Sequence, residues 1–497
     1  MRILFVASEG LPFSKTGGLA DVLAGLPKAL VALGHEVAVV LPRSRGAVEA
    51  ARVTPRVVVP SLTVGPSDRP RFPAVLGDMV VDGVQYFLLD DPGYFDRESL
   101  YGDAAGDYPD NAERYAELSR AAIEIAKHVW LPDVIHCHDW QAALVPVLLR
   151  TVYADDPVLA AVRCVLTVHN LGYHGQFPAA TLARVGLPES LFHMDRLEFF
   201  GDINYLKGGL VYADYLTTVS RRYAREIQTP EVGHGLDGVL ATRADRLVGI
   251  LNGADYAEWN PADDPRIAAA FSAEDLAGKR ACRRDLLSEF ALPDTAGPVL
   301  GMVSRLVDHK GFDLVTEALD ALVGLGLTIV LLGSGEARYE IALREFAALH
   351  PKRCGVRIGY DEKLAHKIIA GSDMFLMPSH EEPSGLTQLY SLRYGTVPIV
   401  RATGGLHDSI EPHDPPRSVG TGFTFTDYTT DAMISCVRRA RAAYDDRSRW
   451  RQLQLAGMGK DFSWPGSARR YVEVYAAAQV LAADQLVPPP DSGSAHV

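Results

Sequence analysis

The chain has few of the features that would assign it to several large classes of protein. It carries only five cysteines in 497 residues, scattered and without a Cys-x-x-Cys pair, which favours buried thiols in a reducing compartment over a disulfide framework or a zinc site. No stretch approaches the ~20 apolar residues of a membrane span. The apolar run near the N-terminus is too short for a signal peptide. We therefore expect a cytoplasmic protein with no membrane partner.

Excess positive charge is also missing. Lys and Arg total 49 against 62 Asp and Glu, so the formal net charge is -13. This balance argues against a general nucleic-acid binder, because nucleic-acid affinity depends on neutralising phosphates with cations. A pocket for a small anionic ligand would have to be built from a few placed Lys and Arg side chains. Internal repeats of solenoid period are absent as well.

The chain does have length and a regular alternation of short apolar runs with helical patterns. Its 497 residues exceed what one hydrophobic core usually supports, so two domains are expected. Apolar runs such as Ile3–Ala7 and Val37–Leu41 predict parallel strands covered on both faces, and the pattern restarts at Val299–Val303. Further strand candidates are 134–136, 165–168, 216–219, 247–251, 328–332, 356–358, 374–377 and 397–400. We predict an α/β fold with two Rossmann-like, doubly wound parallel-sheet domains.

Composition suggests where these domains begin and end. We place the first domain at 1–251 and the second at 252–463, with 252–298, rich in Asp, Ala and Pro, as the crossover. An amphipathic pattern over 464–486 could close the second domain or pack back on the first, and we expect the latter. The Pro- and Ser-containing stretch 487–497 predicts a disordered tail. Open parallel sheets bind ligands at the carboxyl ends of their strands, so we expect the two domains to face a deep cleft.

The most informative motif is Lys-Thr-Gly-Gly-Leu-Ala-Asp at 15–21, between a predicted strand and a predicted helix. Gly17 and Gly18 would let backbone N–H groups approach an anion at a helix N-terminus. Lys15 would add a compact positive charge suited to phosphate. The motif indicates a site for a phosphorylated or nucleotide ligand, although a plain strand-to-helix turn would have the same glycines.

Two histidine-containing segments follow predicted strands in the first half. In His-Cys-His-Asp-Trp at 136–140, we interpret His136 as a buried structural residue and His138 as a group placed to bond a substrate hydroxyl or leaving group. A metal held by this pair is disfavoured, because the nearby third ligand, Asp139, would point elsewhere. The polar and aromatic stretch 167–176, which includes Asn170, suits a loop that contacts sugar hydroxyls, or an ordinary connection.

In the second half, cations and a carboxylate follow predicted strands. Arg305 and Lys310 come after Val299–Val303 and could clamp a diphosphate, although exposed surface cations are the common alternative. The segment 381–388, Glu-Glu-Pro-Ser-Gly-Leu-Thr-Gln, follows Met374–Met377. We expect Gly385 to open a helix whose free N–H groups can receive phosphate. A neighbouring carboxylate would then hold sugar hydroxyls or balance positive charge, or only cap the helix.

Taken together, these segments resemble the glycogen and starch synthase family of GT-B glycosyltransferases. The matching segments run in family order and cover nearly the whole chain apart from the tail: KTGGLADV, HDWQAAL, TVHNLGYHGQF, ILNGAD, VSRLVDHKGFDL, IGYDE, EPSGLTQLYSLRYG and RATGGL. The resemblance implies transfer of glucose from a nucleotide sugar, ADP-glucose in most bacteria, to the non-reducing end of an α-1,4-glucan. It also implies retention of the anomeric configuration, and neither a metal nor a cofactor.

Residue roles are carried over onto matching positions only. The resemblance implies four catalytic residues: His138, Arg305, Lys310 and Glu382. With the residues argued above, it implies a wider binding set: Lys15, Gly17, Gly18, Asp21, Asn170, Asn252, Tyr360, Ser384, Gly385, Leu386 and Thr387. Within that set, Tyr360 would line the base pocket, Asn252 would face the sugar, and the backbone around Leu386 would hold phosphate.

The sequence departs from the family pattern at positions that flank the donor site. His380-Glu381 replaces the usual arginine-aromatic pair, Ser384 the usual cysteine, and His407 the usual alanine. These departures leave open a UDP-glucose donor, a small sugar-phosphate acceptor, or a catalytically weak glucan-binding paralogue. The presence of Arg305 and Glu382 favours an enzyme over the last of these.

Overall fold

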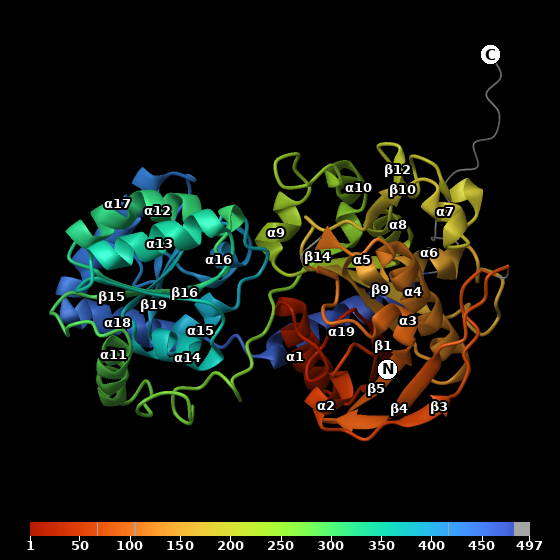
Figure 1. Cartoon of the computed structure of the whole chain (residues 1–497), viewed down its shortest axis with the longest axis horizontal. Helices are drawn as coiled ribbons and strands as arrows, with labels where there is room; N and C mark the ends of the chain where they lie inside the picture. Colours follow the sequence, from red (N-terminus) through yellow and green to blue (C-terminus); the bar gives the residue numbers. More distant parts are fainter. Residues whose placement is uncertain (67, 104–105, 416, 482–497) are drawn as a thin grey trace, which may run out of the picture. The chain divides into compact units, whose positions relative to one another are not determined.

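The computed structural model describes residues 1–66, 68–103, 106–415 and 417–481 (Figure 1). The chain forms two compact units, which we describe one at a time. The first contains residues 1–219, 224–253 and the C-terminal segment from Trp464, and the second contains 220–223 and 254–463. The end of the predicted C-terminal helix, 482–486, and the predicted tail, 487–497, lie outside the described residues.

The first unit is built on a nine-stranded sheet with β1 (Arg2–Val6) near its middle. β1 pairs in parallel with β2 (Glu36–Pro42) on one side and with β8 (Val134–His138) on the other. Beyond β8 the order continues through β9 (Arg163–Val168), β13 (Tyr215–Thr218) and β14 (Leu247–Gly249). Beyond β2 lie β5 (Val84–Asp90), β4 (Ala74–Val81) and β3 (Arg56–Val59), and the last two pair antiparallel.

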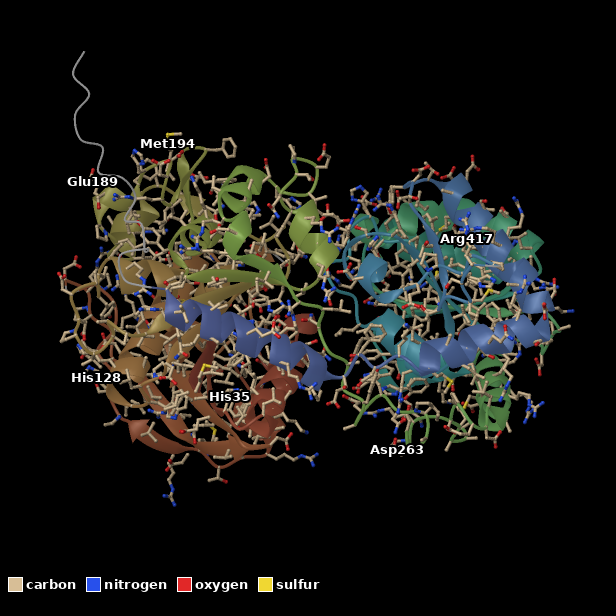
Figure 2. The ribbon with its side chains drawn as sticks, turned by 180° about the vertical axis from the view of Figure 1, so that it is seen from behind. His35, His128, Glu189, Met194, Asp263 and Arg417 are labelled. Carbon is tan, nitrogen blue, oxygen red and sulfur yellow. The ribbon has the colours of Figure 1, made fainter. Side chains whose placement is uncertain are left out.

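Helices cover both faces of this sheet, as its apolar strands require. Ile3 and Phe5 point into one core with α1 (Gly18–Ala32) and α19 (Trp464–Val480), and α4 (Asn111–His128) packs against β1 and β2. Figure 2 shows α19, in blue, lying along the first unit. The other helices are α2 (Ala47–Ala51), α3 (Pro92–Phe95), α5 (Asp139–Ala142), α6 (Leu144–Arg150), α7 (Thr181–Arg184), α8 (Tyr205–Tyr212) and α10 (Asp237–Thr242), with α9 (Arg221–Glu226) at the passage between units.

Two small sheets accompany the main one. β10 (Gln176–Pro178), β12 (Asp202–Asn204) and β11 (Glu198–Phe199) form an antiparallel group, and β6 (Gly102–Asp103) pairs with β7 (Gly106–Asp107). The polar stretch 167–176 therefore runs from the end of β9 into the first strand of the three-stranded group.

The second unit has a six-stranded, all-parallel sheet in the order β17-β16-β15-β18-β19-β20. The strands are β15 (Val299–Val303), β16 (Thr328–Gly333), β17 (Cys354–Ile358), β18 (Met374–Met377), β19 (Val397–Arg401) and β20 (Phe423–Phe425). α11 (Ala277–Glu289) and α14 (Glu362–Gly371) cover one face, and α12 (Phe312–Gly324), α13 (Ala337–Leu349) and α17 (Thr430–Asp445) cover the other. The remaining helices are α15 (Thr387–Arg393), α16 (Gly404–Ser409) and α18 (Arg447–Met458).

Both sheets reverse their direction of winding beside their first strand. In the second unit the chain runs outward from β15 through β16 to β17, then returns to β18 on the other side of β15. In the first unit the same reversal lies between β1 and β8. At such a switch point the loops after the two central strands diverge and leave a crevice where ligands bind. The order predicts a binding site after β1 and β8, and another after β15 and β18.

The described residues show the state of the cysteines and the lengths of the helices. The five cysteines are buried and carry free thiols, and Cys137 and Cys164 approach to 3.6 Å between sulfur atoms on neighbouring strands. Among the helices of the described ranges, none has the length and apolarity needed to cross a bilayer.

A buried lysine on α11 makes the stability of the second unit depend on pH. Lys279 donates to the carbonyl oxygens of Ala370 and Tyr394, both at 2.9 Å, and to the Thr396 hydroxyl at 2.7 Å. Burial lowers the pKa of Lys279 from its usual 10.5 to about 8. Between these values the unfolded chain binds more protons than the folded chain, so the free energy of unfolding rises with pH. The stability that follows from deprotonation of Lys279 is complete above pH 10.5 and is lost as the pH falls through 8.

Between about pH 8 and about pH 9.5, the free energy of unfolding of wild type should rise by about 1.5 kcal/mol relative to that of Lys279→Met. Urea unfolding of both proteins at these two pH values measures the difference directly, and other titrating groups cancel in the comparison. Parallel pH profiles for the two proteins would show that Lys279 titrates at its ordinary value.

Candidate active site

The Lys-Thr-Gly-Gly segment lies at the switch point of the first unit, between β1 and α1. Gly17 is the N-cap residue of α1, with extended backbone, and Gly18 is the first helical residue. The ammonium of Lys15 contacts the Asp21 carboxylate at 2.6 Å. Lys15, Gly17, Gly18 and Asp21 thus lie together at one helix N-terminus, where backbone N–H groups favour an anion.

A glutamate that the sequence reasoning overlooked holds this segment in place. Glu9 is almost fully buried, and its carboxylate accepts hydrogen bonds from the Thr16 hydroxyl, at 2.8 Å, and from the Thr16 backbone N–H. Burial raises the pKa of Glu9 above its usual value. Because Thr16 directly follows Lys15, Glu9 fixes the backbone on which Lys15 is carried. A lone glutamate nine residues into the chain offered no pattern that could have revealed this role.

Three histidine rings meet at the ends of β8 and β9. The His138 Nδ1 atom lies 2.8 Å from His169 Nε2, and the rings of His136 and His138 have centroids 4.2 Å apart. Burial lowers the pKa of His138 well below its usual value and that of His169 to about 3. These two imidazoles are therefore neutral at pH 7, and one ring N–H forms the hydrogen bond between His138 and His169.

The two predicted roles within this motif differ in outcome. His136 is a buried structural residue, as expected, because Thr167 lies 2.6 Å from its Nε2 atom and the Tyr475 hydroxyl lies 2.8 Å from its Nδ1 atom. His138 is also fully buried, which was not predicted, and it stacks on Phe5. Its Nε2 atom is buried without a hydrogen-bond partner among the described residues. Contact between His138 and a sugar remains a prediction.

The residues that follow these histidines form a second polar group. Asp139 has a left-handed backbone, with φ of 56°, and its carboxylate accepts from the His169 backbone N–H at 2.6 Å. Burial raises the pKa of Asp139 to about 7. The Asn170 side chain accepts from the Gly172 N–H at 2.9 Å and so closes the turn after β9. Asp139 therefore ties the β8 and β9 loops together, which its sequence position alone did not indicate.

Asn252 lies at the end of the first unit, just beyond β14. It is 6% exposed, and its Oδ1 atom is buried without a hydrogen-bond partner in the described part of the chain. A buried amide oxygen without a partner is costly unless a ligand or water satisfies it. The position is compatible with the predicted contact to a sugar hydroxyl.

The switch point of the second unit brings Lys310 and Glu382 together. The Lys310 ammonium donates to both oxygens of the Glu382 carboxylate, at 2.8 and 2.7 Å. Ser379 donates to the same carboxylate at 2.9 Å. Both charged side chains are mostly buried, so neither charge is screened by water. Lys310 comes from the loop after β15 and Glu382 from the loop after β18, and the pairing of these strands is what joins them.

Arg305 is the second cation in this group. Its guanidinium is exposed, and its Nη2 atom lies 3.5 Å from the His309 Nε2 atom. Burial, together with the neighbouring charges of Lys310 and Arg305, lowers the pKa of His309. The imidazole is therefore neutral and adds no charge of its own. Within the described ranges, Arg305 has no carboxylate within ion-pair distance, which leaves its charge available to a ligand anion.

The loop after Glu382 differs from the prediction in one respect. Gly385 does not open the helix: its φ is +65°, and α15 begins two residues later, at Thr387, with Leu386 as N-cap residue. The left-handed turn at Gly385 redirects the chain before the helix can start. The predicted phosphate-binding backbone, Leu386 and Thr387, still forms the first turn of α15, where N–H groups lack intrahelical partners.

The loop that carries Glu382 packs against the glycine turn after β19. A Cβ atom on Gly405 would lie 1.9 Å from the Ser384 carbonyl oxygen, and one on Gly404 would lie 2.0 Å from that of Glu382. The Gly405 N–H donates to the Glu382 carbonyl at 3.0 Å. The Ser384 hydroxyl is buried without a hydrogen-bond partner in the ranges the structure describes. Only glycine permits this close approach, so the turn fixes the backbone that carries Glu382.

Three other predicted or divergent residues of this unit are exposed. Tyr360 follows β17 and is 80% exposed. His380 is exposed and lies edge-on to Tyr428 at 4.7 Å, and His407 is exposed on α16. The structure thus brings Arg305, Lys310, Glu382 and the 384–387 backbone into one group, and the Lys15 and His138 segments into another within the first unit.

Comparison with known proteins agrees with this arrangement. The family model described as "Starch synthase catalytic domain" matches residues 2–242, and that described as "Glycosyl transferases group 1" matches residues 284–453. A protein named glycogen synthase from Koribacter versatilis is 52% identical over 97% of this chain and 99% of its own length. Another of that name, from Syntrophotalea carbinolica, is 46% identical over 97% and 99%.

A solved structure shares the fold over most of the chain. It is the catalytic domain of starch synthase IV from Arabidopsis thaliana, bound to ADP and acarbose, with a TM-score of 0.86 and 34% identity over 96% of this chain and 99% of that one. The two Rossmann-like units are thus the GT-B fold expected from the sequence. The chain belongs to the glycogen and starch synthase family and is a glycosyltransferase.

Proposed function

We propose that this enzyme transfers glucose from ADP-glucose to the non-reducing end of an α-1,4-glucan, with retention of the anomeric configuration. The second unit, residues 220–223 and 254–463, binds the nucleotide sugar. The first unit, with its C-terminal helix, serves the acceptor. The proposal includes the cytoplasmic location expected of a glycogen-synthesising enzyme.

The observation that carries the proposal is the charge arrangement beside β15 and β18. A mostly buried ammonium on Lys310, an exposed guanidinium on Arg305 and the first turn of α15 lie on loops that diverge from one switch point. Together they suit a diphosphate, because Arg binds its oxygens as a fork and Lys as a point charge. The related starch synthase IV was solved with ADP, which contains such a group.

Lys310 can bind the diphosphate while it remains hydrogen-bonded to Glu382. An ammonium has three N–H donors, and two of them are directed at the Glu382 oxygens. The third is available to a phosphate oxygen. The carboxylate therefore orients the ammonium in advance, and this preorganisation is what makes an electrostatic contact effective in a transition state.

The reaction breaks the bond between the glucose C1 atom and the diphosphate oxygen, and forms a bond from C1 to the acceptor hydroxyl oxygen. The hydroxyl proton passes to the departing phosphate oxygen on the same face of the sugar, which accounts for retention. Arg305 and Lys310 stabilise the negative charge that develops on the leaving group. Glu382 stabilises the positive charge that develops on the glucose ring. This scheme requires no covalent carboxylate intermediate.

In the first unit, we assign sugar contacts to the groups that have hydrogen-bonding capacity left. The Asn252 Oδ1 and His138 Nε2 atoms are buried without partners among the described residues, and Asn170 lies on the polar loop after β9. The Lys15 segment, held by Glu9, would contact donor or acceptor groups near the phosphate. Tyr360, exposed on the second unit, would stack on the nucleobase.

The direct test offers ADP-glucose and UDP-glucose separately, each with glycogen, and measures nucleotide release together with glucose incorporated into polymer. We expect ADP release matched by chain extension. UDP release in place of ADP release would show that the enzyme uses UDP-glucose as its donor for the same reaction. A parallel assay replaces glycogen with a small sugar phosphate, and nucleotide release with that acceptor alone would change the acceptor. Glycogen binding without release from either donor would show a glucan-binding paralogue and contradict the proposal.

A further inference from the structure

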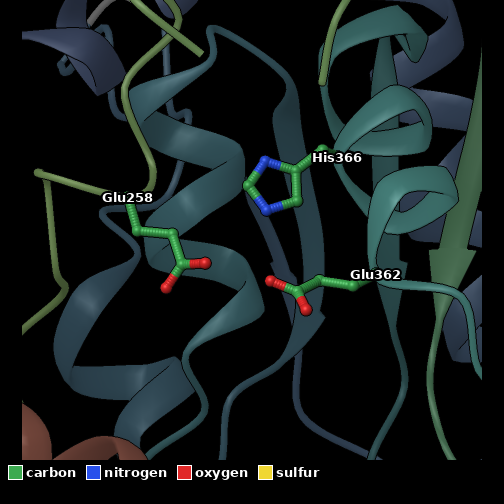
Figure 3. A group of neighbouring side chains, drawn as sticks. All are labelled: Glu258, Glu362 and His366. Carbon is green, nitrogen blue, oxygen red and sulfur yellow. The ribbon is translucent and has the colours of Figure 1, made fainter. Parts of the chain in front are cut away.

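A separate group of chemistry-bearing side chains lies on the second unit: Glu258, Glu362 and His366. Glu362 and His366 are one turn apart on α14, and Glu258 belongs to the segment that leads towards α11. One ligand atom from each residue lies within 4.8 Å of the others. Figure 3 shows the two carboxylates and the imidazole ring converging on one space. The proposed glucosyl transfer makes no use of this group.

The His366 ring is held rigidly. It is fully buried and stacks on the Trp259 ring, with centroids 3.6 Å apart. Its Nδ1 atom lies 2.7 Å from an Asp264 carboxylate oxygen. An ionised carboxylate only accepts hydrogen bonds, so Nδ1 carries the proton and donates. The other ring nitrogen, Nε2, therefore presents a lone pair.

That lone pair has no partner among the described residues, although the Nε2 atom is buried. Figure 3 shows Nε2 on the edge of the ring that faces Glu258 and Glu362. Three electron-pair donors thus face one space, which is unfavourable unless a cation or a proton lies between them. In metal sites, a carboxylate often accepts the N–H of one histidine ring nitrogen and so fixes the tautomer. The other ring nitrogen is then free to bind the metal.

The charges around the group also leave room for a divalent ion. Arg266 donates through Nη2 to Glu258 Oε1, at 3.0 Å, and to Glu362 Oε1, at 3.1 Å. It therefore covers one oxygen of each glutamate. With all groups ionised, the three carboxylates and one guanidinium sum to two negative charges. A divalent cation on the side of His366 would balance them.

We propose that Glu258, Glu362 and His366 bind one divalent transition-metal ion, with Zn²⁺ as the best match. Imidazole and carboxylate ligands suit Zn²⁺, and three protein ligands leave a fourth position for water. Zinc–ligand bonds of about 2 Å require the donor atoms to draw together by roughly 1 to 2 Å. Glu362 is exposed and Glu258 half-buried, so both can move toward the fixed ring. The ion would clip the segment containing Glu258 to α14.

The test titrates chelator-treated full-length protein with ZnCl2, using calorimetry for stoichiometry and thermal unfolding for stability. We expect wild type to bind about one more Zn²⁺ than the double variant Glu258→Gln/Glu362→Gln. Saturating Zn²⁺ should raise Tm by about 5 °C in wild type and leave the double variant unchanged. Glu345→Gln, which removes an exposed carboxylate from α13, should behave as wild type.

Equal Zn²⁺ stoichiometry and equal Tm gain in wild type and the double variant would overturn the proposal and identify an adventitious ion only. Absence of Zn²⁺ binding by wild type would overturn it as well, and would assign the space to a proton shared by the carboxylates. The glutamine variants are preferred to changes at His366, because His366 packs inside the fold. Donor and acceptor assays are unaffected by either result, so failure here leaves the proposed reaction standing.

Discussion

Lys310→Ala should reduce kcat/KM for glucosyl transfer by about 10³-fold while the protein remains folded. Removing one preorganised donor from a developing negative charge costs about that much in other enzymes. Here the change also leaves the Glu382 carboxylate, which accepts two bonds from Lys310, in a mostly buried place without its cation. The measurement is steady-state nucleotide release with saturating glycogen, accompanied by circular dichroism and urea unfolding.

Lys352→Ala is the matched control, because Lys352 is exposed on the same unit between α13 and β17. It should keep kcat/KM within about twofold of wild type, since isolated surface cations contribute little. A Lys310→Ala enzyme that retains more than about a tenth of wild-type kcat/KM would remove Lys310 from the mechanism.

Trp464→Ala should lower the free energy of unfolding of the first unit by about 4 kcal/mol, with a fall in Tm of roughly 10 °C. Trp464 is the first residue of α19 and is 6% exposed. A Cβ atom on Gly25 would lie 1.8 Å from the indole nitrogen, and one on Gly253 would lie 2.5 Å from the indole ring. The indole therefore fills a space that two glycines leave open, and its loss creates a cavity between α19 and α1.

Urea unfolding followed by circular dichroism measures this effect. Circular dichroism is chosen because tryptophan fluorescence would itself change in the variant. Val480→Ala, at the far end of α19 and 84% exposed, should change stability by less than about 0.5 kcal/mol. Gly25→Ala should destabilise in the same direction as Trp464→Ala, because the indole cannot yield to the added methyl. A cost below about 1 kcal/mol for Trp464→Ala would show that α19 contributes little to the first unit.

The strands that were predicted well are those buried on both faces. β15 and β18 have the predicted bounds, because a continuous apolar run in a parallel sheet has few alternative structures. The edge strand β3 and its neighbour β4 were missed because their apolar runs include exposed positions, such as Val57 and Val80. α11 was missed inside the stretch taken as a crossover, because its charged sequence carries a weak apolar pattern.

The residues of the candidate site could be predicted, but not their pairing. Motif positions placed Lys310 and Glu382 after strands, whereas their ion pair spans 72 residues of sequence and depends on β15 lying beside β18. The roles of Glu9 and Asp139 were missed because each acts through a contact with another segment, at Thr16 and His169, that the position in the sequence does not reveal. The burial of His138 follows from three neighbouring rings, Phe5, His136 and His169, which no local pattern reveals.

The central claim is that Arg305 and Lys310, beside the first turn of α15, bind the diphosphate of the donor. The most direct measurement is a crystal structure of the full chain with ADP-glucose or ADP. We expect phosphate oxygens within hydrogen-bond distance of Arg305 and of Lys310, with Lys310 still bound to Glu382. A diphosphate that contacts neither cation would contradict it.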